Sequence, residues 1–420
     1  MRGALLLVAT LSFAALSGCI SAPGADADPA SSDVPARSGP AWGVPIPEAI
    51  AGLKPVARAL EVPIGAGLWV DGDHAYVSSL REGLTVVNVS DPAKPRVVAT
   101  LKDVGGGTSL YARDADVAHV GDRTILVLAG QGQGLHVVDV TAPETPRYIA
   151  TIDVKPNHNL AVHPTLPLVY NSASTGKGGQ VDVVDLSNPD DPKVLGAFGT
   201  HGCHDITFHT SPEKERLYCA GVDVTEIWDL ADPLKPTLIV TIENDAAKSY
   251  GLGLHHSAYA TRNGTLLIIG DETWGGSGPG CGANTPAGST FLGSLWFYDV
   301  TDEKKPVLLS NIAPSAPVGE YATGIVGGVD PSKPPSPFGV IGALSCTSHF
   351  GSFVPGHDML VWGFYRAGVV LIDYSDAKRP VIVDQWSTGA NVWDVKILNG
   401  YMFTGDLARG LDVLEFRAKV

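Results

Sequence analysis

The feature that most constrains the fold of this chain is a phrase that recurs along its length. It reads Gly-Leu-x-Val-Val-Asp-Val-Ser-Asp-Pro-x-Lys-Pro, with small variations from copy to copy. Copies begin at Gly83, Gly134, Gln180, Val224, Ser294 and Gly368, and a shortened copy begins at Gly410. The first copies are spaced by roughly 40 to 50 residues, a range typical of propellers and solenoids. Most of the sequence therefore encodes a repeated architecture, and function is to be sought where the repeat is broken.

Each repeat contains four runs with strand composition. The phrase itself is a β-branched and aromatic run that ends in a polar and proline-rich turn. A further run follows the turn, as at Arg96–Leu101, and two runs precede the phrase, as at Asp205–Thr210 and Arg216–Gly221. Four strands per repeat is the composition of a propeller blade. The Asp or Asn of the phrase recurs in almost every copy, so we expect it to form the turn: Asn88, Asp139, Asp185, Asp229, Asp299 and Asp373.

The number of repeats predicts the number of blades. Seven third strands are present, but only six are followed by a fourth, and Lys54–Leu60 has the composition of the missing one. We therefore predict an all-β, seven-bladed β-propeller over residues 51–420, with the ring closed by an N-terminal strand that completes the last blade. Such closure leaves only short sheet edges. A β-solenoid is the alternative.

Composition and charge exclude several classes of function. The chain has 420 residues, 44% of them hydrophobic and 17% charged, which is typical of a globular protein with a large core. Its net charge is −15 and it has no cluster of Lys and Arg, so we expect no nucleic-acid partner. The sequence has no Gly-x-Ser-x-Gly, no P-loop and no His-Glu-x-x-His.

The first residues are typical of an export signal. Met1-Arg2 is followed by an apolar run, Ala4–Leu16, and then by Ser17-Gly18-Cys19. The run is too short to span a bilayer. Leu-Ser-Gly-Cys resembles the lipobox of prokaryotic lipoproteins, which implies a signal peptide over residues 1–18 and lipidation of Cys19. An ordinary signal peptide is the alternative.

Residues 19–50 lack a periodic apolar pattern and are rich in Ala, Pro, Ser, Asp and Gly, so we expect a flexible tether. The expected location is outside the cytoplasm. A lipid at Cys19 would hold the protein on the outer side of the cytoplasmic membrane, or in the periplasm or outer membrane.

Four cysteines follow the predicted tether: Cys203, Cys219, Cys281 and Cys346. An even number in an exported chain favours disulfides. Cys203 and Cys219 fall on the first and second strands of one blade, and Cys281 and Cys346 flank another, so each pair is a candidate bridge. Free or metal-bound thiols are the alternative, although no Cys-x-x-Cys is present.

Two long segments interrupt the repeat. One, at 272–292, lies between the second and third strands of the fifth blade, and the other, at 313–344, precedes the sixth. Both are rich in Gly, Pro and Ser. Long loops in a compact fold are typically lids, binding loops or disordered additions.

Histidines mark the inner strands of four successive blades. When these strands are aligned, His158, His204, His256 and His349 fall at equivalent positions. Blade two has Ala115 there, blade seven has Trp393, and blade one has a glycine near Gly65. Because inner strands line the channel of a propeller, the four imidazoles should lie at one level.

This pattern predicts a site for one transition metal ion, copper, zinc or iron, because imidazole is the common protein ligand of these metals. Asp271 and Glu272 are candidate carboxylate ligands, and His255 is a reserve ligand whose alternation points it to the other face. The alternative is a wet channel in which the histidines bind water and backbone. We expect the remaining histidines at the surface: His74, His119, His136, His163, His201, His209 and His357.

The phrase resembles the LVIVD repeat of predicted surface propellers of bacteria and archaea. His158-Asn159, His204-Asp205 and the pairing of His256 with Gly270-Asp271-Glu272 resemble, more narrowly, the secreted choice-of-anchor B group. This chain departs from that group at Ser348-His349-Phe350, where the group has Asp-His-Asn. A remoter resemblance, to selenium-binding protein and methanethiol oxidase propellers, implies a copper site.

Three functions are compatible with these observations. The first is a lipid-anchored binding module for a protein, glycan or small molecule. The second is a metal-dependent oxidoreductase that acts on a small molecule, with the four histidines as ligands and Asp271 or Glu272 as an extra ligand or general base. The third is a metal that only holds the blades together.

Overall fold

The computed structural model describes residues 42–62, 65–79, 82–103, 109–130, 132–154, 156–243, 254–261, 264–272, 293–314 and 346–419. The predicted signal peptide, Cys19, Cys281 and all but the ends of the two predicted insertions lie outside these residues.

The described residues form seven four-stranded antiparallel sheets. Blade one holds β2 (Leu68–Asp71), β3 (His74–Ser79), β4 (Gly83–Asn88) and β5 (Arg96–Leu101). Blade two holds β6 (Ala112–Val120), β7 (Arg123–Gly130), β8 (Gly134–Asp139) and β9 (Arg147–Ile152). Blade three holds β10 (Asn159–Val162), β11 (Leu168–Ser172), β13 (Val181–Asp185) and β14 (Lys193–Phe198). Blade four holds β16 (Asp205–Thr210), β17 (Glu215–Ala220), β18 (Val224–Asp229) and β19 (Thr237–Glu243).

Blade five holds β20 (Leu254–Thr261), β21 (Leu266–Glu272), β22 (Leu295–Asp299) and β23 (Val307–Ile312). Blade six holds β24 (Gly351–Phe353), β25 (Met359–Gly363), β26 (Val369–Asp373) and β27 (Val381–Trp386). Blade seven holds β28 (Val392–Leu398), β29 (Tyr401–Asp406), β30 (Leu411–Ala418) and β1 (Ile50–Ala59). A small extra sheet pairs β12 (Gly176–Lys177) with β15 (His201–Gly202).

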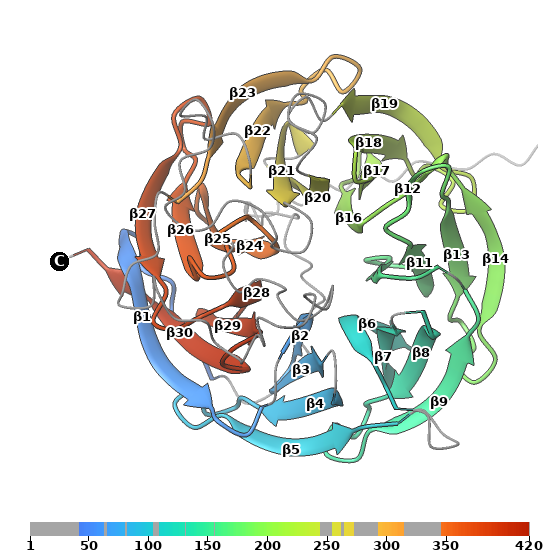
Figure 1. Cartoon of the computed structure of the whole chain (residues 1–420), viewed down its shortest axis with the longest axis horizontal. Coiled ribbons are helices and arrows are strands. Elements are labelled where there is room, and N and C mark those ends of the chain that lie inside the picture. The colour runs from blue at the N-terminus through green and yellow to red at the C-terminus, as the bar shows by residue number, and fades with distance from the viewer. Residues whose placement is uncertain are drawn as a thin grey trace, which may run out of the picture.

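The seven sheets stand around a ring, with the first strand of each at the inner edge and the fourth at the rim (Figure 1). This confirms the predicted all-β, seven-bladed propeller. The described residues contain no helix, and so none that could cross a membrane.

The last blade is built from both ends of the described chain. β1 pairs antiparallel with β30, with Leu53 opposite Phe416 and Ala59 opposite Leu411. The Leu53 amide also donates to Asp384 Oδ2 on β27, at 2.8 Å. The N-terminal strand therefore contacts blades six and seven.

The turn after each third strand is formed as the phrase predicts. The Asp139 carboxylate accepts a hydrogen bond from the Thr141 amide at 3.0 Å, and Asp185 accepts one from the Ser187 amide at 2.7 Å. These are the local turns that short acidic side chains stabilise. Each blade needs such a turn after its third strand. The recurrence of the Asp or Asn in the phrase is therefore explained by turn formation, without a catalytic role.

Packing between blades forms the core. Between blades two and three, for example, Ile125 and Val127 of β7 belong to one buried cluster with Leu160 of β10 and Val169 of β11. Each such side chain contributes about 1.5 to 3 kcal/mol when fully buried. Carboxylates of the inner strands add bonds between blades: the Leu160 amide donates to Asp114 Oδ2 at 3.1 Å, and the Val162 amide donates to Oδ2 of the buried Asp116 at 2.7 Å. The inner strands are thereby held in register around the channel.

Candidate metal centre

Four histidines stand at the entrance of four adjacent inner strands. The amides of His158, His204 and His349 each donate to a carbonyl of the second strand of the same blade, at 2.7, 2.5 and 2.9 Å. His256 lies in a register shift of β20 between His255 and Ser257. His158 and His204 thus directly precede β10 and β16, His349 lies two residues before β24, and His256 lies at an irregularity within β20.

The imidazoles are in contact with one another. The ring centroids of His158 and His204 are 4.5 Å apart, those of His204 and His256 are 4.0 Å apart, and those of His256 and His349 are 4.0 Å apart. The sequence alignment of the four histidines therefore corresponds to a continuous row of rings from blades three to six.

A carboxylate completes the group. Glu272, the last residue of β21, is 3% exposed, and its Oε2 lies 3.9 Å from His256 Nε2. Tyr365 donates a hydrogen bond to the other carboxylate oxygen, Oε1. One ligand atom each from His204, His256 and Glu272 lie within 4.8 Å of one another, all buried. These three residues are therefore close enough to share one ion.

The imidazoles are neutral, with lone pairs available. Burial, followed by the charge of Arg113, lowers the pKa of His204 to about 3. Burial, followed by the neighbouring histidines, holds the pKa of His256 well below its usual range. Among the described residues, both ring nitrogens of His256 and Nδ1 of His204 and of His349 are buried without a hydrogen-bond partner. Nitrogen atoms that lack protein partners and belong to neutral rings fit coordination of a transition metal.

Two of the predicted ligands lie apart from this group. Asp271 Oδ2 accepts a hydrogen bond from the Gly293 amide at 2.8 Å, and His255 Nδ1 lies 2.8 Å from Thr225 Oγ1. Successive residues of a strand point to opposite faces. The structure thus brings Glu272, and not Asp271 or His255, to the row of histidines.

The other three blades supply different residues at the same level. A register shift in β6 between Ala112 and Asp114 places Arg113, and not the expected Ala115, at this position. A similar shift in β28 places Trp393 there, as predicted. In blade one the matching amide, which donates to Ser78 O at 2.8 Å, is that of Ala66 and not of Gly65.

A signal for Arg113 is present in the sequence. An Asp or Asn follows the ring residue directly in four blades, and these are Asp114, Asn159, Asp205 and Asp394. Alignment on this acidic or amide residue, and not on the second strand, selects Arg113.

Aromatic side chains close one side of the centre. The Phe350 ring centroid is 4.4 Å from that of His349 and 4.6 Å from that of His256. Trp393 lies 4.1 Å from His349, and Tyr365 lies 5.1 Å from it. Phe350 and Tyr365 were not predicted: Phe350 stands where four other blades have Asp or Asn, and Tyr365 lies outside the strands, between β25 and β26.

Comparison with known proteins bears on the repeat. Residues 65–103, which span most of blade one, match the sequence model of the LVIVD repeat. The chain carries an LVIVD repeat. No curated protein matches the sequence.

Among solved structures, this LVIVD propeller is similar to Saccharomyces cerevisiae Sqt1, with 13% identity, a TM-score of 0.49, and 86% of this chain and 83% of the other covered. It is also similar to the computationally designed protein Ika8, with 11% identity, a TM-score of 0.48, and 86% and 99% covered.

Several other histidines of the LVIVD propeller lie inside the protein. His136 is 1% exposed, His163 is 2% exposed and His209 is fully buried. The expectation of surface positions was wrong for these three. His136 and His209 lie on β8 and β16, and His163 directly follows β10 and packs against Phe208 of blade four. His163 Nε2 lies 3.1 Å from Glu215 Oε1, which gives it a structural partner.

One disulfide joins two described residues. Cys203 is bonded to Cys219, across the first two strands of blade four. Cys346 is also disulfide-bonded. The cysteine next to His204 is therefore not a thiolate ligand.

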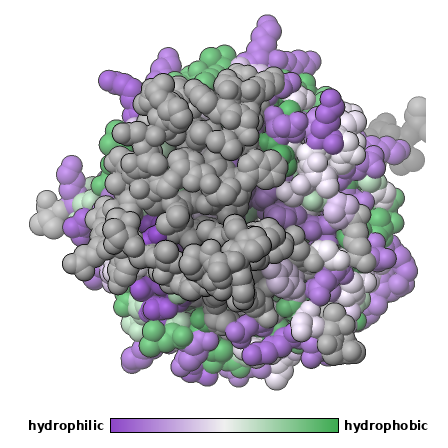
Figure 2. All heavy atoms as spheres, viewed as in Figure 1, coloured by the Kyte–Doolittle hydropathy of each residue, from purple (hydrophilic) through white to green (hydrophobic). Residues whose placement is uncertain are grey.

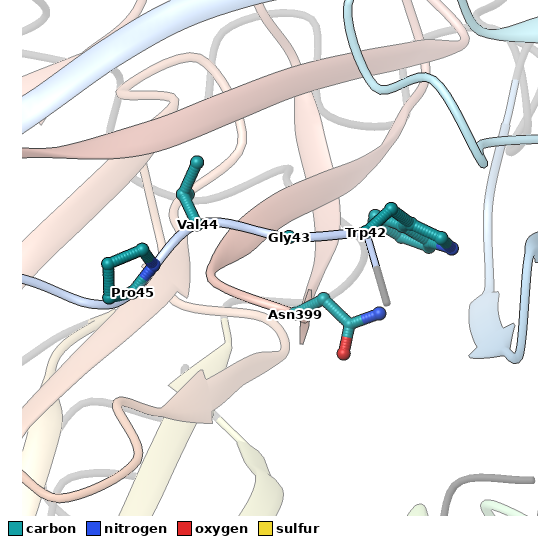
Figure 3. Close-up of a pocket in the computed structure, with 5 residues that line it drawn as sticks. All are labelled: Trp42, Gly43, Val44, Pro45 and Asn399. Atoms are coloured by element: carbon teal, nitrogen blue, oxygen red, sulfur yellow. The ribbon is translucent and has the colours of Figure 1, made fainter. Parts of the chain in front are cut away.

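The surface offers a shallow pocket far from the histidines. Trp42, Gly43, Val44 and Pro45 line it together with Asn399, which follows β28 (Figure 3). Trp393 stands at the other end of β28, roughly 20 Å away at about 3.3 Å per residue.

On the face shown in Figure 2, hydrophilic side chains surround scattered hydrophobic ones at the rim. We therefore place the candidate site at the histidines.

Proposed function

We propose that this protein is a metal-centred binding module, held outside the cytoplasmic membrane by a lipid at Cys19. A β-propeller with an LVIVD repeat suggests an interaction module. The observation that carries the metal proposal is the buried group of His204, His256 and Glu272, whose ligand atoms lie within 4.8 Å of one another. His158 and His349 flank this group and are its further candidate ligands.

The donor set favours copper, zinc or iron over magnesium or calcium. Imidazole nitrogens are suited to the first three metals, whereas the last two are bound mostly by oxygen. The net charge of −15 and the exported location inferred from the N-terminus support a role at the cell surface, with a protein, glycan or small molecule as partner.

The test is elemental analysis by mass spectrometry of the full chain, purified in detergent without a histidine tag. We expect near one equivalent of copper, zinc or iron. The protein should then be stripped with a chelator and reconstituted with each metal in turn. Absence of bound metal after reconstitution would contradict the proposal and leave the histidines as polar residues of the channel.

A second candidate function is a metal-dependent oxidoreductase. The Tyr365 hydroxyl donates to Glu272, which places a proton-bearing phenol beside a candidate ligand in a buried site. A bound metal with an open position supplies redox chemistry or an activated water.

Oxygen uptake in the presence of small thiols tests this second candidate. The metal-loaded wild type should consume dioxygen, and Tyr365→Phe should retain the metal but consume it more slowly. Equal and negligible uptake by both proteins would leave the binding module as the function.

A further inference from the structure

Arg113 is a buried cation at the level of the histidines. Its side chain is 8% exposed and extends from the register shift in β6. Its guanidinium carbon lies 5.9 Å from the centre of the Trp393 ring. β6 and β28, the strands that carry Arg113 and Trp393, lie on either side of β2 at the inner edge of the ring (Figure 1). The two side chains therefore meet across blade one.

Among the described residues, the Nε of Arg113 is buried without a hydrogen-bond partner, and no ion pair to the Arg113 side chain is found. A guanidinium carries five N–H donors and does not lose its charge in proteins. Burying an N–H donor of such a group without an acceptor is unfavourable. The Trp393 ring, 5.9 Å from the guanidinium carbon, offers no oxygen or nitrogen acceptor to these donors, because its indole N–H is itself a donor.

The charges of the site also call for an anion. Arg113 contributes one positive charge and Glu272 one negative charge, while metal-bound imidazoles are neutral. A divalent metal would then leave the buried site with two uncompensated positive charges. An anion that reaches both the metal and Arg113 would offset one of them and satisfy the guanidinium donors.

The walls of the site indicate what kind of anion. Ala66, Phe350, Tyr365 and Trp393 form one buried apolar cluster next to Arg113. The parallel N–H donors of a guanidinium match the two oxygens of a carboxylate. An apolar wall beside a carboxylate-binding group suits a small organic acid and not an inorganic ion.

We propose that Arg113 binds the carboxylate of a small organic acid at the histidine centre. This inference rests on the proposed metal-binding function for the second contact of the acid, whereas the contact with Arg113 does not need the metal. Tyr365, 6.0 Å from Trp393 between ring centres, lies on the same wall and would contact the apolar part of the acid.

The experiment is a calorimetric titration of the full chain, metal-loaded and metal-free, with acetate and benzoate as probes. Acetamide and benzamide, which have the same shapes without the charge, are the matched controls. We expect at least one acid to bind about tenfold or more tightly than its amide. Arg113→Met should abolish this preference. Arg113→Lys keeps the positive charge but not the two parallel N–H donors of the guanidinium, so it should retain part of the preference. Arg96→Met, on the exposed strand β5, should bind as the wild type does.

The outcomes separate the two proposals. Metal content is measured for every variant by mass spectrometry. If wild type and Arg113→Met hold equal metal and bind acids and amides alike, the Arg113 proposal is overturned while the metal site stands. If the wild type holds no metal but still prefers acids in an Arg113-dependent way, only the metal proposal fails. If neither acid binds the wild type in its metal-loaded or metal-free form, the Arg113 proposal is wrong. This result is expected if an acidic side chain of the chain itself pairs with Arg113.

Discussion

His204 and His256 come from adjacent blades, yet their imidazole rings are in contact, with centroids 4.0 Å apart and ring planes tilted by 41°. Two neutral rings in such contact lose the hydrogen bonds that their ring nitrogens make to water, and this loss is unfavourable unless another group binds these nitrogens. Nδ1 of His204 and both nitrogens of His256 have no hydrogen-bond partner among the described residues. An unmade hydrogen bond of a buried polar atom costs about 1 to 3 kcal/mol. A shared ion would remove that cost.

The first prediction concerns His204. Replacing His204 with Ala should lower the metal content from near one equivalent to near zero, because His204 contacts both His158 and His256 and belongs to the three-residue group. Elemental analysis measures the metal, and circular dichroism measures the fold, which should persist because the apolar clusters between the blades do not include His204. His357→Ala, at a partly exposed turn, is the matched control. Unchanged metal in His204→Ala would count against a shared site.

The second prediction concerns the charge of Glu272. Glu272→Gln keeps an oxygen that accepts the Tyr365 hydrogen bond but removes the negative charge next to His256. Metal affinity, measured by competition with a chelator, should fall about tenfold or more, since even partners of metal ligands change affinity by 10- to 100-fold. Glu144→Gln, on an exposed turn, should leave the affinity unchanged. An unaltered affinity in Glu272→Gln would exclude the carboxylate as a ligand.

The fold could be predicted because it repeats. Strand composition and the proline turn occur in each copy, so an error in one repeat is corrected by the others. Asp205–Thr210 and Arg96–Leu101, for example, coincide with β16 and β5 as predicted. The blade count follows directly, since closure of a ring requires that all copies have the same architecture.

The candidate site was predictable only in part, because it depends on features that do not repeat. The four histidines share a register position, and the structure brings them together. Arg113 was missed because blade two has no histidine to mark this position, and alignment on the second strand selected Ala115, which lies beyond the register shift between Ala112 and Asp114. Glu272 and Asp271 were not distinguished, since the direction of the last residues of β21 depends on the register with β20.

The third prediction tests the membrane anchor. Cys19 follows Leu16-Ser17-Gly18, so we expect it to carry the lipid. Cells fed an alkyne-labelled fatty acid should incorporate the label into the wild type but not into Cys19→Ser, and the variant should move from the membrane to the soluble fraction. Cys19 is the only cysteine of the first 200 residues. Cys346→Ser, which removes a cysteine elsewhere in the chain and keeps Cys19, serves as the control and should still incorporate the label. Equal labelling of wild type and Cys19→Ser would contradict the anchor.

The fourth prediction concerns the disulfide of blade four. Cys203 and Cys219 are both buried, and 16 positions separate them in the sequence. A bridge over a loop of this length stabilises by about 3 kcal/mol through the unfolded state. The double variant with alanine at both positions should lose at least this amount in urea denaturation followed by tryptophan fluorescence. A loss well below about 1 kcal/mol would show that the bridge contributes little beyond packing.

The fifth prediction is a loss of stability in mild acid that comes from His136. The ring lies on β8 and is 1% exposed; its Nδ1 contacts Thr151 Oγ1 at 2.8 Å, and its Nε2 has no partner among the described residues. Burial lowers the pKa of His136 to about 4. The unfolded chain, with an ordinary histidine pKa of about 6.5, therefore binds the proton first.

It follows that the contribution of neutral His136 to stability is fully present above about pH 6.5 and is lost as the pH falls toward 4. Between pH 7 and pH 5 the wild type should lose about 2 kcal/mol more than His136→Asn, which cannot take up a proton but keeps a polar group near Thr151. Urea denaturation of both proteins at the two pH values measures the difference. His357→Asn should follow the wild type. Equal losses in wild type and His136→Asn would mean that the buried ring is protonated in the native state, with a counter-charge that balances it.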